Sequence, residues 1–222
     1  MSNFSNAIIN QFKENANPIN AIAQAQYMKN KFVFFGLTAP KRRELQKPFL
    51  IQKYLPSKSE LDVLVKELWT QPQRELHYFT QELVRKYIKQ LELRDIDLFE
   101  FMIVNNSWWD SVDFIAPNLV GAYFEKFPNQ RDVFIKKWLQ SNNIWLQRSA
   151  ILFQLKYKQQ LDTVLLATII NKLLGSKEFF INKAIGWILR EYGKTNPNWV
   201  LDFVSKTELS NLSKREAIRL IK

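Results

Sequence analysis

The sequence Lys183-Ala-Ile-Gly-Trp187 is one of five similar stretches that recur along the chain, and these stretches decide the fold. When the five are aligned on one position, successive positions are separated by 37, 37, 34 and 33 residues. The stretches are Arg74–Phe79, Ser111–Ile115, Arg148–Leu152, Lys183–Trp187 and Arg215–Arg219, and the aligned positions are Leu76, Asp113, Ala150, Ala184 and Ala217.

Each stretch belongs to a segment with apolar residues at helical spacing, and a second helical segment separates one stretch from the next. A helix-pair period of this length is typical of HEAT-type repeats, which stack because no pair can bury its apolar face alone. We therefore predict an all-α fold, a curved α-solenoid of stacked helix pairs. Alanines at the aligned positions would let neighbouring helices approach closely. The alternative is an irregular helical bundle in which the spacing is accidental.

Local signals agree with helices throughout. Ser57–Glu60 and Ser213–Glu216 both have the Ser-x-x-Glu pattern of a capping box, and Pro40 suits the first turn of a helix. Only residues 32–35 have strand-like composition, and four residues without a partner make no sheet. No low-complexity linker interrupts the chain, so we predict a single domain over residues 1–222.

Composition excludes several classes of site. The chain has no cysteine, which excludes disulfides, thiolate metal sites and iron–sulfur clusters, and its one histidine is His77. None of its five glycines lies in the Gly-x-Gly spacing of nucleotide-binding loops. We see no signal peptide and no apolar run long enough for a membrane span. The sequence thus predicts a cytoplasmic protein, which we expect to act as a monomer without metal or cofactor.

The formal net charge of +11 and the pI near 9.7 indicate a polyanionic partner. Nucleic acid is the first candidate and an acidic membrane surface the second. Charge alone is also compatible with a basic but unspecific surface.

Three segments contain residues suited to chemistry. Trp109 and Asp113 are four residues apart, so they share a helical face, and Asp113 lies among apolar neighbours where a carboxylate must be paired or used. Arg148 could reach a phosphate or could pair with a nearby acid, and the residues leave both open. Trp187 follows Gly186, which indicates a close approach, either by a ligand or by the next repeat.

These segments resemble the AlkD-type alkylpurine DNA glycosylases over essentially the whole chain. The resemblance rests on Ser107–Asp113, Ile144–Arg148 with Leu152–Lys158, Lys177–Tyr192, Tyr27–Phe32 with Gly36 and Pro40–Arg43, and Leu212–Ile218. It implies HEAT-like repeats that grip duplex DNA on a basic concave surface. It also implies hydrolytic excision of cationic N3- and N7-alkylated purines, leaving an abasic site without a base-recognition pocket.

The resemblance further implies roles for individual residues. Trp109, Trp187 and Asp113 match the catalytic cleft of the family, and Arg148 matches its arginine. The residues expected to contact DNA are Arg148, Thr38, Lys29, Arg43, Lys183 and Arg190. Thr38 stands where some members carry Gln, which puts its contact to the DNA strand in doubt.

The implied chemistry has a simple physical form. An alkylated purine that is already cationic leaves as a neutral base without a general acid, while positive charge develops on the deoxyribose. Asp113 could stabilise that charge and orient water, and the two tryptophans could hold the sugar and phosphate. Two alternatives are a HEAT-repeat binder of DNA without enzymatic activity and a solenoid that binds proteins. The first predicts loss of Asp113 or a cleft tryptophan, and the second predicts a surface that is not rich in Lys and Arg.

Overall fold

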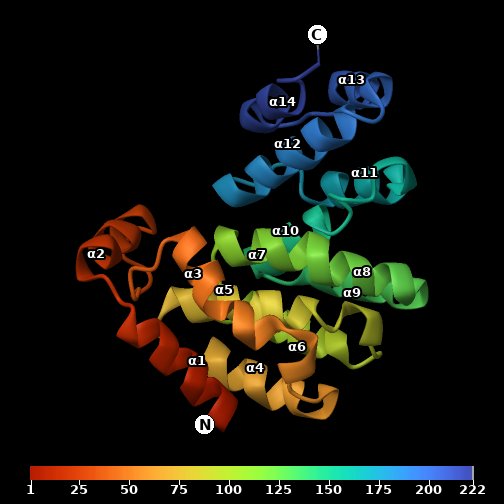
Figure 1. Cartoon of the computed structure of the whole chain (residues 1–222). Coiled ribbons are helices and arrows are strands. Elements are labelled where there is room, and N and C mark those ends of the chain that lie inside the picture. The colour runs from red at the N-terminus through yellow and green to blue at the C-terminus, as the bar shows by residue number, and fades with distance from the viewer. Residues whose placement is uncertain (222) are drawn as a thin grey trace. The chain divides into compact units, whose positions relative to one another are not determined.

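The protein is all-α. A computed structural model describes residues 1–221, and in that range there is no β-strand, only one isolated bridge between Val33 and Gln73. This confirms the helical fold class. The chain forms two compact units, Met1–Glu92 and Leu93–Lys222, coloured red to yellow and yellow to blue in Figure 1. The predictions of one domain and of a curved array stay predictions.

The first unit contains five α-helices joined by short 3₁₀ turns. They are α1 (Asn3–Glu14), α2 (Pro18–Tyr27), α3 (Ala39–Gln46), α4 (Leu61–Trp69) and α5 (Arg74–Arg85), with turns at Lys47–Leu50, Gln52–Tyr54, Lys58–Glu60 and Ile88–Gln90. The capping box predicted at Ser57–Glu60 is present, and Pro40 lies in the first turn of α3, as predicted. Fully buried Phe12 and Phe79 meet edge to face and join α1 to α5.

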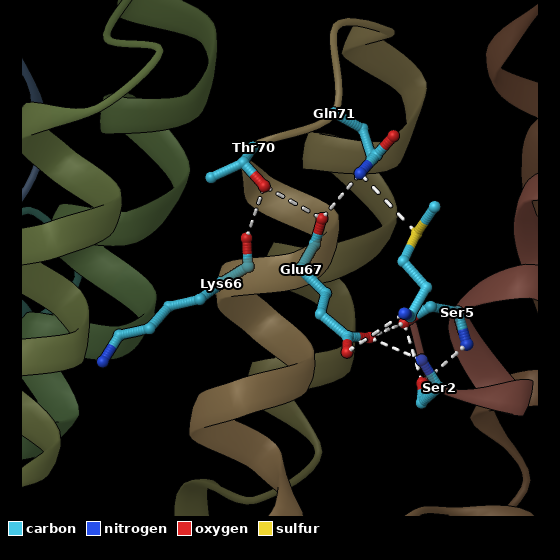
Figure 2. Close-up of polar contacts among 7 residues, drawn as sticks. Ser2, Ser5, Lys66, Glu67, Thr70 and Gln71 are labelled. Atoms are coloured by element: carbon cyan, nitrogen blue, oxygen red, sulfur yellow. Dashed lines mark hydrogen bonds and ion pairs between the residues drawn. The ribbon is translucent and has the colours of Figure 1, made fainter.

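The start of α1 is fixed to α4 by one carboxylate, drawn in Figure 2. Glu67 accepts hydrogen bonds from the Ser2 backbone N–H at 3.0 Å and from the Ser5 hydroxyl at 2.7 Å. Both donors lower the pKa of Glu67, and the Ser2 N–H has the larger effect. Ser2 is also the N-cap of α1, so a few polar residues both begin the helix and hold it in place.

The loop before α3 is held by a second carboxylate. Glu75, almost fully buried, accepts hydrogen bonds from three consecutive backbone N–H groups, those of Phe35, Gly36 and Leu37. Gly36 has φ of 87°, and a Cβ there would lie 1.9 Å from the Asn17 carbonyl oxygen, so only glycine fits.

The second unit contains the row of helices that carries four of the five aligned stretches. Its elements are α6 (Asp95–Val104), α7 (Trp109–Ile115), a π-turn (Ala116–Val120), α8 (Gly121–Lys126), α9 (Pro128–Gln140), α10 (Ile144–Leu152), a 3₁₀ turn (Lys158–Gln160), α11 (Thr163–Lys172), α12 (Phe179–Gly193), α13 (Pro197–Lys206) and α14 (Asn211–Ala217). Within this unit α7 packs on α10, α10 on α12, and α12 on α14, in the order of the stretches (Figure 1).

The aligned alanines have the role that the repeat predicts. Ala150, Ala184 and Ala217 are fully buried, one on each of the successive helices α10, α12 and α14. A small side chain at this position lets the helices pack closely. The repeat in the sequence therefore corresponds to a physical stack of helices in the second unit.

The close approach indicated by Gly186 is made by the next helix. A Cβ on Gly186 would lie 2.5 Å from Glu216 Cβ and 2.9 Å from the Ser213 carbonyl oxygen, both in α14. Packing between repeats, one of the two explanations open in the sequence, thus accounts for this glycine.

Replacing Gly186 by Ala is expected to destabilise the protein, because a backbone oxygen of α14 cannot move aside as a side chain can. Overpacking of this kind costs about 1–3 kcal/mol, against a gain of up to ~1 kcal/mol in helix propensity. Urea unfolding measures the net effect. Gly193→Ala in the same helix is the control. Its Cβ would meet side chains and no backbone, Ile221 at 3.1 Å and Val200 at 3.9 Å, so this variant should be neutral or stabilising. Equal stability of the two variants would contradict this account of the packing.

One helix start was predicted wrongly. Ser213–Glu216 is not a capping box, because α14 begins at Asn211 with Ser210 as its N-cap. The Ser213 hydroxyl instead donates to the Asn182 carbonyl oxygen in α12, and Glu216 forms ion pairs with cations. The Ser213 hydroxyl also contacts that of the N-cap Ser210, at 2.9 Å, so it is shared between the first turn of α14 and α12.

Candidate active site

Helix α7 begins a widened helical segment that positions Asp113. Proline lacks an N–H, and its ring clashes with the carbonyl group four residues earlier, which for Pro117 is that of Asp113. The chain avoids this clash by forming the π-turn Ala116–Val120 directly after α7. Trp109 and Asp113 therefore lie one turn apart on the same short helix, as the sequence predicts.

Asp113 is held by Arg148 of α10 through two hydrogen bonds. Arg148 Nε donates to Oδ1 at 2.7 Å and Nη2 donates to Oδ2 at 2.9 Å, a bidentate arrangement. Arg148 Nη1 donates to the Phe180 carbonyl oxygen at 2.5 Å, next to the start of α12. The guanidinium group thus links three successive helices of the row.

The pairing of Arg148 with an acid is the alternative that the sequence left open. The arginine side chain is only 3% exposed, and Asp113 is 17% exposed. Arg148 therefore acts here by holding Asp113. Its predicted contact to DNA stays a prediction.

The pKa of the Asp113 carboxyl is raised above its usual value because burial disfavours the charged form. The hydrogen bonds and positive charge of Arg148 oppose this rise, and the nearby Asp110 adds to it. Burial thus opposes ionisation of this carboxyl, and Arg148 is the neighbouring group that favours its charged form.

Helix α12 brings the remaining predicted residues to the same place. Lys183, Trp187 and Arg190 lie three or four residues apart and so share one face of the helix. Together with α7, α10 and α14 this face encloses a cleft of about 310 Å³. The residues that line it are Trp109, Asp113, Arg148, Phe179, Phe180, Lys183, Trp187, Arg190, Glu216 and Arg219. The structure therefore brings together six of the residues singled out in the sequence.

Sequence reasoning missed the other four residues of the cleft. Phe179 and Phe180 stand in the stretch that carries the resemblance but have no spacing pattern of their own. Phe180 packs against Trp108 and Trp145, with ring centroids 5.1 and 5.0 Å apart. Glu216 was assigned to a capping box, and Arg219 ends the fifth aligned stretch but had no pattern that indicated a role in the site.

Three predicted DNA-contacting residues belong to the first unit. Lys29, Thr38 and Arg43 are all exposed, and Lys29 has an unusual positive φ of 56°. Thr38 caps the N-terminus of α3, where its hydroxyl oxygen accepts from the Lys41 N–H at 3.5 Å. This gives the threonine a local structural role, while contacts of the three residues to DNA stay predictions.

Within residues 1–221 no three acidic or histidine side chains gather as metal ligands. No helix in that range is long and apolar enough to cross a membrane. The only histidine, His77, is fully buried in the first unit.

The stacked helices and the cleft define a helical-repeat protein whose site combines a paired carboxylate, aromatic rings and cations. The sequence model of a family described as DNA alkylation repair enzymes matches residues 8–221, so the chain belongs to that family. A solved structure described as a predicted DNA alkylation repair enzyme from Enterococcus faecalis is similar, with 31% identity and a TM-score of 0.86. The match covers 93% of this chain and 96% of that one. No curated protein sequence matches the chain significantly.

Proposed function

We propose that the protein is a monofunctional DNA glycosylase that hydrolyses the N-glycosidic bond of N3- and N7-alkylated purines in duplex DNA. The product of this reaction is an abasic site, as in base excision repair. In this proposal the protein acts as a monomer in the cytoplasm. The observation that carries the proposal is the Asp113 carboxylate, held by Arg148 in a cleft lined by Trp109 and Trp187.

The carboxylate suits a reaction in which positive charge develops on a sugar. Bond cleavage from a cationic purine transfers positive charge to the deoxyribose, and a fixed anion stabilises it without reorganising water. A unit charge pair at about 4 Å and an effective dielectric constant near 20 gains on the order of 4 kcal/mol. That corresponds to about 10³ in rate. Arg148 offsets part of this charge, so the effect of Asp113 lies at or below that value.

The tryptophans supply the other contacts. Both line the cleft and both are partly exposed, so their rings can pack against the sugar and the adjoining phosphate. Aromatic faces also attract cations, which favours the charged sugar over the neutral one. Asp113 then also orients the water that attacks the sugar at C1′.

The chemistry of the cleft lining favours action without base flipping. Enzymes that flip a base read its edge with hydrogen-bonding side chains in a closely fitting pocket. Among the described residues that line this cleft there is no amide, hydroxyl or imidazole side chain. Its charged side chains pair with one another, Asp113 with Arg148 and Glu216 with the three cations of α12 and the chain after α14. Selectivity then comes from the lability of the cationic lesion and not from recognition of the base.

The proposed mechanism can be tested by comparing a positively charged lesion with a neutral one. The protein is expected to release 7-methylguanine from a duplex that carries it, and to leave hypoxanthine in a matched duplex, because a neutral base needs a general acid to depart. Chromatography of the free bases measures both. Release of the neutral base at a comparable rate would contradict the mechanism, and binding of both duplexes without release would contradict glycosylase activity.

A further inference from the structure

A buried carboxylate on α14 gathers three cations at one edge of the cleft. Glu216, whose side chain is 6% exposed, forms ion pairs with Lys183 and Arg190 of α12. Its third pair is with Arg219, whose Nη1 lies 3.3 Å from Glu216 Oε1. All four side chains line the cleft that contains Asp113.

The fold places Glu216 there through close packing of two helices. The Glu216 Cβ would lie 2.5 Å from a Cβ on residue 186, so the glycine allows the carboxylate to reach α12. The Ser213 hydroxyl, bonded to the Asn182 carbonyl oxygen at 2.8 Å, fixes the same turn of α14. The position of the carboxylate is thus set by backbone contacts and not by the cations alone.

The cluster keeps an excess of positive charge. Three cations meet a single carboxylate, and the two more exposed of them are Lys183, at 39%, and Arg219, at 58%. Burial and the neighbouring arginines lower the pKa of Lys183, because each cation disfavours the charge of the others. An added anion would relieve this repulsion.

The excess charge also conflicts with the sugar chemistry unless an anion is bound. Asp113 stabilises a cation in the same cleft, and uncompensated Lys and Arg side chains at its edge would oppose that effect. A backbone phosphate beside the target nucleotide would neutralise them.

We infer that Lys183, Arg190 and Arg219, positioned by Glu216, form a binding site for one DNA phosphodiester that flanks the target nucleotide. The inference rests on the proposed action on DNA at this cleft. Arg and Lys bind phosphate through charge-assisted hydrogen bonds, and Glu216 acts as a positioning residue that keeps the three donors together.

The test uses a duplex with a stable tetrahydrofuran abasic analogue, so that no bond is cleaved. A methylphosphonate, which is uncharged, replaces the phosphate on one side of the analogue or on the other. In the wild-type protein one of the two replacements is expected to weaken binding about tenfold, the effect of one charge-assisted contact. Fluorescence anisotropy at a fixed salt concentration measures the dissociation constants.

Three variants separate the site from general electrostatics. In Glu216→Gln the penalty for the methylphosphonate should shrink below about threefold, although the protein gains positive charge, because the donors lose their anchor. Arg219→Gln, at an exposed position, should shrink it too without affecting the fold. Asp202→Asn is the matched control, since Asp202 lies on α13 and pairs with Lys206 outside the cleft, and it should keep the full penalty.

The pattern of penalties decides the inference. A penalty in the wild type and in Asp202→Asn that is lost in Arg219→Gln supports it. Equal penalties in all proteins, or none in the wild type on either side, would overturn it. This experiment measures binding and not catalysis, so its outcome can be distinguished from that of the proposed function. A protein that shows the expected penalties but releases no alkylpurine would support the phosphate site and contradict the glycosylase activity.

Discussion

Replacing Asp113 by Asn is expected to slow excision of a cationic alkylpurine by about 10²–10³-fold while leaving duplex affinity nearly unchanged. Asn has the shape of Asp but lacks the charge that opposes the developing sugar cation. An interaction made mainly in the transition state is lost from the chemical step and not from ground-state binding. Arg148, buried beside it, loses its counter-charge, so the variant should also unfold at a lower temperature.

Single-turnover kinetics measure the rate of excision, and fluorescence anisotropy on the same duplex measures the affinity. Both are measured well below the temperature at which the variant unfolds. Trp109→Ala and Trp187→Ala serve as the comparison. Ring packing contributes to the ground state and to the transition state, so its loss should weaken DNA binding as well as slow the reaction. Excision by the Asn variant at the wild-type rate would make Asp113 a structural residue. Loss of DNA binding in that variant would contradict the separation of binding from chemistry.

Replacing Arg148 by Gln is expected to shift the pH dependence of excision upward. Burial already raises the pKa of Asp113, and Arg148 is the group that opposes the rise. Arg148 is an opposite charge that favours the ionised carboxyl, so its removal should raise the pKa of Asp113 further. Excision needs the ionised carboxylate and therefore falls as pH falls through this pKa. The variant should lose activity at higher pH than the wild type.

Single-turnover rates measured across pH give the midpoint of the acidic limb for each protein. Arg131→Gln is the matched control, because Arg131 pairs with Asp162 and Asp132 and does not line the cleft. It should leave the midpoint unchanged. An unshifted midpoint in Arg148→Gln would show that the limb does not report Asp113. Loss of the buried pair also costs about 3–5 kcal/mol, so folding of the variant is checked by thermal unfolding.

The repeat in the sequence was enough to predict the helix row, because each aligned residue has to fit against the same neighbour in the next repeat. Ala150 and Ala184 show this directly, since both are fully buried between successive helices. The pairing of Trp109 with Asp113 was predictable for a similar reason, as both lie on one helix with fixed geometry.

Contacts between helices could not be predicted in the same way. Nothing in the local sequence distinguishes an arginine that binds phosphate from one that holds a carboxylate 35 positions away, as Arg148 does. Glu216 illustrates the opposite error, where a local pattern indicated a cap but cations from α12 hold the side chain. Long side chains reach several partners, and only the packing of the helices selects among them.

The central claim is that this cleft cleaves the glycosidic bond of a cationic purine. The most direct test measures release of 7-methylguanine from a duplex under single-turnover conditions, beside spontaneous loss from the same duplex without protein. We predict release well above the spontaneous rate, with one abasic site formed for each base. Release at the spontaneous rate from fully bound duplex would contradict the account and would leave a protein that binds DNA without repairing it.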